Sequence, residues 1–104
     1  MLSLPLAIAD KTEFDHAVLE IVEAMSPDVV YIRHNIAQDW DGDWAVYFRV
    51  LLSDEVGRKR LHEVATKVRT LLERKLDPLS MGLFSYHNFR TVAEQAVLRE
   101  ESWN

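Results

Sequence analysis

Apolar and polar residues alternate between Asp28 and Ser53, and this alternation predicts a β-hairpin of two long strands. The apolar residues at even positions are Val30, Ile32, Ile36, Trp44, Val46, Phe48, Val50 and Leu52. Because successive side chains of a strand point to opposite faces, both strands present one apolar face. We therefore expect the hairpin to be the centre of the fold, with the remaining elements covering that face.

The tip of the hairpin fixes the register. In an antiparallel pair of strands, two residues that lie opposite each other point to the same face. The even-numbered apolar residues of both strands therefore share a face only if the residue numbers of each opposed pair add to an even number. A two-residue turn at Asp41-Gly42 would make these sums odd and split the apolar residues between the two faces. A three-residue loop from Trp40 to Gly42 keeps the sums even and places Gly42 where a positive φ is needed. The expected pairs are Gln38 with Trp44, Ile36 with Val46, His34 with Phe48, Ile32 with Val50, and Val30 with Leu52.

The odd-numbered residues form the other face, where Arg33 is expected opposite Arg49. Like charges directly across a ladder are unfavourable unless another group neutralises them. A partner carrying carboxylates would do so, because arginine binds carboxylate through two parallel hydrogen bonds. We therefore predict a contact surface made of Tyr31, Arg33, Tyr47 and Arg49. Two alternatives stay open: the arginines extend into water or find local carboxylates, or the terminal helix, Val92 to Leu98, folds back over this face. In the second case Glu94 or Glu100 would supply the carboxylates.

Helical spacing of apolar residues predicts a helix on each side of the hairpin. The first begins at Thr12 and ends at Ser26-Pro27. The second runs from about Glu55 to Leu76, follows a Ser53 or Asp54 cap, and carries Gly57 in its first turn. Its apolar stripe comprises Leu61, Val64, Ala65, Val68, Leu71, Leu72 and Leu76.

The two ends of the chain add smaller elements. Gly82 to Arg90 is expected to form a further strand. Thr91 can cap a last short helix with Val92, Ala93, Ala96 and Val97 on its inner side, and Trp103 is expected to pack onto the domain. Leu2, Leu4, Leu6 and Ile8 alternate, which suggests a short edge strand interrupted by Pro5, or alternatively a plain N-terminal arm.

The resulting element order is (β)αββαβα in one domain spanning residues 1–104. We predict an α+β fold with an antiparallel sheet built on the central hairpin and two helices on one face. With the N-terminal strand this becomes a ferredoxin-like βαββαβ sandwich or a related arrangement.

Composition narrows the possible functions. The chain has 104 residues, 48% of them hydrophobic, which is enough for a core of its own. It has no cysteine, which excludes disulfides and thiolate chemistry and fits a cytoplasmic protein. The net charge of -5 argues against a dedicated nucleic-acid binder. The N-terminus has no basic segment and no long apolar run, so we expect no signal peptide and no membrane span.

The sequence offers little catalytic or metal-binding chemistry. No two of the four histidines stand at the spacing of helical metal ligands. Asp39, Asp41 and Asp43 crowd the hairpin tip, but acidic residues are ordinary in turns and a calcium loop needs glycine and glutamate at other positions. The three glycines are too far apart to form a phosphate-binding loop. We therefore expect no catalytic residues, no metal, no cofactor and no enzymatic activity.

The function that remains is a small protein-interaction or regulatory module. It would assemble through the open sheet face, as a homodimer or with a different protein partner, because tyrosine and arginine dominate binding energy at such interfaces. The alternative is an RNA- or anion-binding module that uses Arg33, Arg49 and the exposed tyrosines. Three basic residues on the second helix, Arg60, Lys67 and Arg74, could add to that alternative.

Overall fold

The computed structural model describes residues 11–103, which form an α+β fold around a three-stranded sheet. The elements are α2 (Lys11–Ala24), β1 (Val29–Gln38), β2 (Trp44–Leu52), α3 (Asp54–Lys59), α4 (Leu61–Leu76), η1 (Pro78–Met81), β3 (Phe84–Thr91), α5 (Val92–Leu98) and η2 (Glu101–Trp103). The predicted α+β class is confirmed, and the predicted order of elements is matched in part from α2 onward. The predicted N-terminal strand, Leu2 to Ile8, lies outside the described residues.

The hairpin has the predicted register along most of its length. The pairs from Gln38–Trp44 to Ile32–Val50 are those expected from the sequence. At the tip the Asp39 amide donates to the Asp43 carbonyl at 2.8 Å, and Gly42 has a φ of 84°. The three-residue loop therefore forms, and the apolar sets of both strands meet on one face.

The register changes at the start of β1, where Val30 forms a β-bulge. Val29 pairs with Leu52 and Tyr31 pairs with Leu51, so the predicted Val30–Leu52 pair is wrong. A bulge places two residues of one strand opposite one residue of its partner. Val29 takes the core position and is buried, whereas the side chain of Val30 is 46% exposed. The amide of Val29 donates to the carbonyl of Met25 at 3.1 Å, which ties the bulge to the preceding turn.

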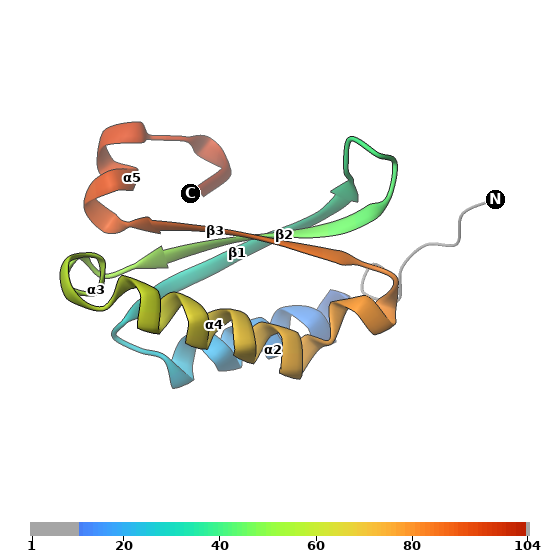
Figure 1. Cartoon of the computed structure of the whole chain (residues 1–104), viewed down its shortest axis with the longest axis horizontal. Coiled ribbons are helices and arrows are strands. Elements are labelled where there is room, and N and C mark those ends of the chain that lie inside the picture. Colours follow the sequence, from blue (N-terminus) through green and yellow to red (C-terminus); the bar gives the residue numbers. More distant parts are fainter. Residues whose placement is uncertain (1–10, 104) are drawn as a thin grey trace.

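The third strand corrects the predicted antiparallel sheet. The strand order is β1-β2-β3, and β3 runs parallel to β2. α4 leads the chain back along the sheet, so β3 starts at the same end as β2 (Figure 1). A crossover helix of this kind is what parallel neighbours require. The direct β2–β3 pairing differs from the split βαβ of a ferredoxin-like sandwich, and the described sheet has three strands rather than four.

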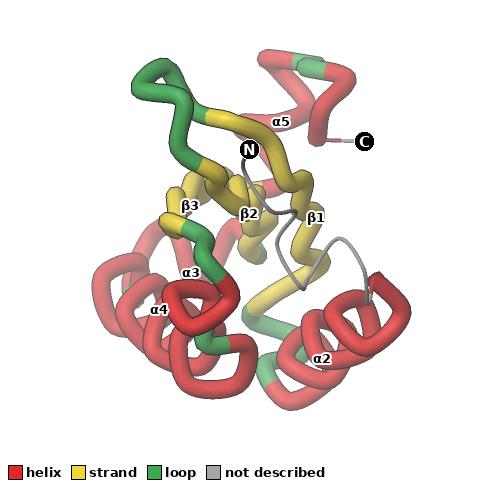
Figure 2. The backbone as a smooth tube through the Cα atoms, turned by 90° about the vertical axis from the view of Figure 1, so that its right-hand side faces the viewer, coloured by secondary structure: helices red, strands yellow, loops and turns green. Residues whose placement is uncertain are grey.

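α2 and α4 cover one face of the sheet, as the sequence predicts (Figure 1). α2 lies beneath β1, and α4 lies beside α2 (Figure 2). The core between the two layers contains Phe14, Val18, Ile21, Val46, Phe48, Val50, Val64, Val68 and Leu72, among others. None of the helices in residues 11–103 is long and apolar enough to cross a membrane.

The single helix expected from Glu55 to Leu76 is two helices, α3 and α4, which break at Arg60. Arg60 has a φ of -135°, outside the helical region. Its guanidinium group binds both carboxylate oxygens of Asp28, at 2.8 and 3.1 Å. This contact joins the helix break to the turn before β1, which is a long-range interaction that helical spacing does not reveal.

Candidate functional site

The face of the sheet opposite α2 and α4 carries all four residues of the predicted contact surface: Tyr31, Arg33, Tyr47 and Arg49. Arg33 lies directly opposite Arg49, as the register predicts. β3 adds Asn88 beside Arg49 and Tyr86 beside Tyr47. The face therefore has a row of Arg33, Arg49 and Asn88, next to a row of Asn35, Tyr47 and Tyr86.

The C-terminal segment, residues 92–103, covers one end of this face. α5 and the C-terminus lie on the side of the sheet away from α2 and α4 (Figure 1). The hydroxyl of Tyr31 donates to the carbonyl of Trp103, and the Trp103 side chain is 3% exposed. The guanidinium of Arg90 lies 4.6 Å from the centre of the Trp103 ring. The prediction that Trp103 packs onto the domain is confirmed, and the face is only partly open.

Polar contacts hold α5, rather than the apolar inner side that the sequence predicts. Thr91 and Glu94 form a reciprocal capping box at the start of α5. The buried residue of α5 is Gln95, whose amide donates to the Glu100 carbonyl at 2.9 Å. Val97 is 81% exposed. With seven residues, α5 is too short to lay an apolar stripe on the sheet, so the predicted inner side is wrong.

The two carboxylates proposed for the facing arginines lie elsewhere. Glu94 closes the capping box of α5, and Glu100 pairs with Arg90 at 2.9 Å. Arg49 donates from Nη1 to the side-chain oxygen of Asn35, while its buried Nε has no acceptor among the described residues. Arg33 stacks 4.4 Å from the centre of the Tyr31 ring. Within residues 11–103, neither Arg33 nor Arg49 contacts a carboxylate.

A polar pocket of about 450 Å³ opens beside Arg49. It is lined by Asn35, Tyr47, Arg49, Asn88, Phe89, Arg90, Glu100, Ser102 and Trp103. Residues of all three strands line it together with residues of the C-terminal segment. The sequence alone did not reveal Asn88, Arg90 and Ser102 as site residues. The alternation of side chains along a strand shows its two faces, but it does not show which strand is its neighbour or which segment folds back over the sheet.

Aromatic residues occupy the end of the face near the hairpin tip. The rings of Tyr47 and Tyr86 stack with centres 5.1 Å apart and planes 15° from parallel. The Tyr86 hydroxyl donates to the Asp39 carboxylate at 3.0 Å, and this hydrogen bond raises the pKa of Tyr86. Beyond them Phe84 is 50% exposed. This end of the face has no cover in the described part of the chain.

The acidic tip has the geometry of an ordinary turn. The Asp39 carboxylate accepts the backbone amides of Asp41 and Asp43, each at 3.0 Å. Ligand atoms of the three aspartates lie within 4.8 Å of one another, and Asp41 and Asp43 are exposed. Hydrogen bonds from an aspartate to nearby backbone amides are typical turn chemistry, so the tip stays outside the candidate site.

Two histidines lie on the core face instead. His34 is half-buried there, as predicted, with Nε2 3.1 Å from the carboxylate of Asp15. His87 lies beside Phe48, with Nε2 3.6 Å from the carboxylate of Glu73. Burial lowers the pKa of His87. Both side chains belong to the core layer and take no part in the open face.

Comparison of the chain with protein-family models, with curated proteins and with solved structures found no match.

Proposed function

We propose that the protein is a non-enzymatic interaction module that binds a protein partner through the open part of its sheet face. The partner presents carboxylates to Arg33 and Arg49. The predicted surface of Tyr31, Arg33, Tyr47 and Arg49 is retained with one change. Tyr31 anchors the C-terminal segment, whereas Asn88 and Tyr86 extend the surface on β3.

One observation carries this proposal: two opposed arginines share a face, and within residues 11–103 neither contacts a carboxylate. Opposed like charges destabilise a strand pair, and a buried donor without an acceptor costs about 1–3 kcal/mol. Arg49 shows both features, since it faces Arg33 and its Nε has no acceptor in the part of the chain that the structure describes. A partner's carboxylate at the pocket beside Arg49 would accept from the Arg49 guanidinium group and reduce the repulsion between the two arginines.

The surroundings of Arg49 suit a protein side chain. The amides of Asn35 and Asn88 offer further hydrogen bonds, and the Tyr47–Tyr86 pair adds an aromatic surface next to them. Aromatic residues and arginine are enriched where protein interfaces concentrate their binding energy. The net charge of -5 does not oppose an acidic partner here, because the open face carries Arg33 and Arg49, and Glu100 at the pocket is paired with Arg90. We place this module in the cytoplasm, which the lack of cysteine supports.

The stacked tyrosines also support a second candidate, an RNA-binding module. Aromatic rings among arginines on a sheet can stack bases while the arginines contact phosphates. The acidic net charge favours the protein partner over RNA. The same residues would serve either ligand, so the two candidates differ in the partner and not in the surface.

The test is capture of partners from source lysate with and without nuclease, using wild-type protein and Arg33→Glu, Arg49→Glu and Arg74→Glu variants. We expect a stoichiometric protein that survives nuclease. Arg33→Glu and Arg49→Glu should each weaken its binding by about 2–5 kcal/mol, as for a charge removed from a buried interfacial pair. Arg74→Glu is the matched control, because Arg74 is exposed on α4, on the helical side of the sheet.

Three outcomes contradict the proposal. Capture that nuclease abolishes would identify the RNA-binding module instead. Equal capture by Arg49→Glu and Arg74→Glu would show that the sheet face is not the contact surface. Unchanged assembly of Arg49→Glu with a lowered melting temperature would show that Arg49 serves the fold alone.

A further inference from the structure

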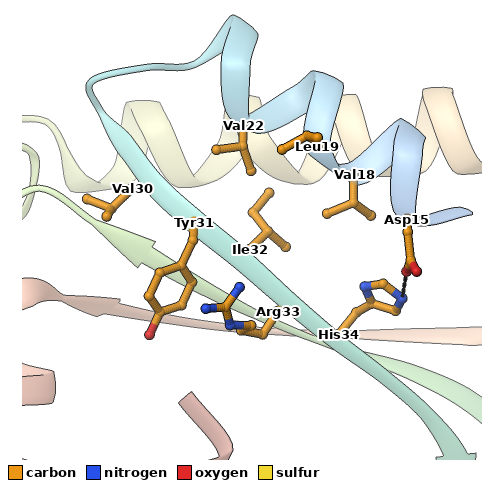
Figure 3. A pocket seen from close by; sticks show the side chains of 9 residues that line it. All are labelled: Asp15, Val18, Leu19, Val22, Val30, Tyr31, Ile32, Arg33 and His34. Atoms are coloured by element: carbon orange, nitrogen blue, oxygen red, sulfur yellow. Dashed lines mark ion pairs between the residues drawn. The ribbon is translucent and has the colours of Figure 1, made fainter. Parts of the chain in front are cut away.

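A second surface lies along the outer edge of β1, where a groove of about 510 Å³ runs between this strand and α2. It is lined by Asp15, Val18, Leu19, Val22, Val30, Tyr31, Ile32, Arg33 and His34. Apolar side chains of α2 face Val30 and Ile32 across the groove (Figure 3). Leu19 is 55% exposed and Val30 is 46% exposed, so two large apolar side chains meet water at this edge.

The backbone of β1 offers hydrogen bonds at the same edge. The Asp39 amide bonds the Asp43 carbonyl, and backbone groups along an antiparallel strand point alternately to one neighbour and away from it. Odd-numbered residues of β1 therefore bond β2, and the amide and carbonyl of Ile32 point outward. Within the described sheet β1 has β2 as its one neighbour. A long edge strand without cover is a template for pairing with another chain.

We propose that this edge forms a homodimer in which the β1 strands of two copies pair antiparallel around Ile32. A two-fold axis at this point places the same patch of both copies in contact. α2 of one copy, which carries Leu19, then packs near α2 of the other, and Val30 of each copy lies opposite His34 of the other, next to Ile32. The contact buries in one step the two exposed apolar side chains that line the groove.

Charge complementarity supports a second copy as the occupant. Pairing around Ile32 sets Arg33 of one copy opposite Tyr31 of the other, on the open face. Tyr31 bonds the carbonyl of Trp103, so η2 lies over Tyr31 and carries the exposed Glu101 with it. Within residues 11–103, Glu101 contacts no basic side chain and Arg33 contacts no carboxylate. Each copy thus supplies the charge that the other lacks.

This inference concerns the edge of β1 and shares only Arg33 with the proposed function; the pocket beside Arg49 belongs to the proposed function alone. The first test is analytical ultracentrifugation of the full chain over a range of concentrations. We expect a reversible dimer whose dissociation constant rises at least tenfold in Leu19→Lys and in Val30→Lys. Val97→Lys is the control, since it places the same charge on an exposed apolar residue of α5, away from the β1 edge, and should leave the dimer intact. Circular dichroism verifies that each variant is folded.

A charge exchange tests the register. Arg33→Glu and Glu101→Arg should each weaken the dimer, because each homodimer then sets like charges together. An equimolar mixture of the two variants should recover association, since every contact in the mixed dimer joins opposite charges again. Hydrogen exchange provides a local readout: the amide of Ile32 should be protected in the wild-type dimer and exchange rapidly in Leu19→Lys.

Several results would overturn the inference. A wild-type chain that stays monomeric at all concentrations has no such dimer. If dimers form only after residues 1–10 are deleted, the chain's own N-terminal segment occupies the groove. If Leu19→Lys and Val30→Lys remain dimeric while Arg49→Glu does not, the copies meet through the sheet face. That last result would leave the proposed function standing.

Discussion

Gly57 of α3 lies directly against Thr91 at the end of β3. A Cβ atom on Gly57 would lie 2.3 Å from the γ-methyl carbon of Thr91, which is closer than real atoms approach. Thr91 cannot turn away freely, because its hydroxyl accepts the amide of Glu94 in the capping box of α5. One glycine thus allows α3, β3 and α5 to meet.

The first prediction is that Gly57→Ala lowers the free energy of unfolding by about 1–3 kcal/mol, the usual cost of overpacking. It should do so although alanine is the better helix former by about 1 kcal/mol. Thr91→Ser is the matched rescue, because it removes the methyl group and keeps the hydroxyl cap. Urea unfolding should show that Gly57→Ala no longer lowers the free energy of unfolding when Thr91→Ser is also present. A neutral or stabilising Gly57→Ala in the wild-type background would contradict the close approach.

The second prediction concerns Phe48, which lies fully buried in the core between the rings of Phe14 and His87. Phe48→Ala should lower the free energy of unfolding by about 3–5 kcal/mol, because it removes buried apolar area and leaves a cavity. Phe84→Ala is the control: Phe84 is half exposed on the other face, and its loss should cost under about 1 kcal/mol. Similar losses in both variants would contradict the assignment of faces.

The third prediction is a decline in stability on acidification that depends on His87. Burial holds its pKa below the ordinary value of 6.5, although the Glu73 carboxylate acts in the opposite direction and Arg69 adds to the lowering. The neutral form is therefore favoured in the native state, and the unfolded chain binds the proton first as pH falls. Stability should be complete above about pH 6.5 and decrease toward and through the native pKa.

Thermal unfolding between pH 7.5 and 5 tests this dependence. His87→Gln should show a shallower decline than wild type, since the group that gains a proton on unfolding is gone. His16→Gln is the control, because the His16 side chain is 72% exposed and lies outside the core. The same slope in His87→Gln and wild type would show that other groups cause the decline.

The fourth prediction addresses the ion pair that joins the α3–α4 break to the hairpin. The hydrogen bonds from Arg60 lower the pKa of Asp28 below 3.8. The pair should therefore stabilise the fold above that pH and lose its effect as pH falls through the native pKa of Asp28. Asp28→Asn and Arg60→Met should each lower the melting temperature at pH 7, and the double variant should lower it by less than the sum. Additive losses would show that the two side chains act separately.

The sequence by itself determined the centre of this protein. Alternation from Ile32 to Val50 decided which side chains enter the core, because a strand has two faces and the apolar set can bury only one. The position of Gly42 decided the loop, because a three-residue hairpin loop needs a positive φ at that place. The pairing of residues across the hairpin also placed Arg33 opposite Arg49. The sequence further identified Thr91 as a helix cap and Trp103 as a packed residue near the end of the chain.

Only the tertiary structure decided what depends on contacts between distant segments. The bulge at Val30 follows from the turn before β1, and the break at Arg60 accompanies its pairing with Asp28 across 32 positions of sequence. Periodicity gives the faces of a strand but not its direction, so β3 could be read as a strand while its parallel pairing with β2 could not. The cover over Tyr31 and the pairing of Glu100 with Arg90 rather than with Arg49 likewise arise from how the C-terminal segment returns to the sheet. Long-range packing decided these features, and local residue patterns carry no record of it.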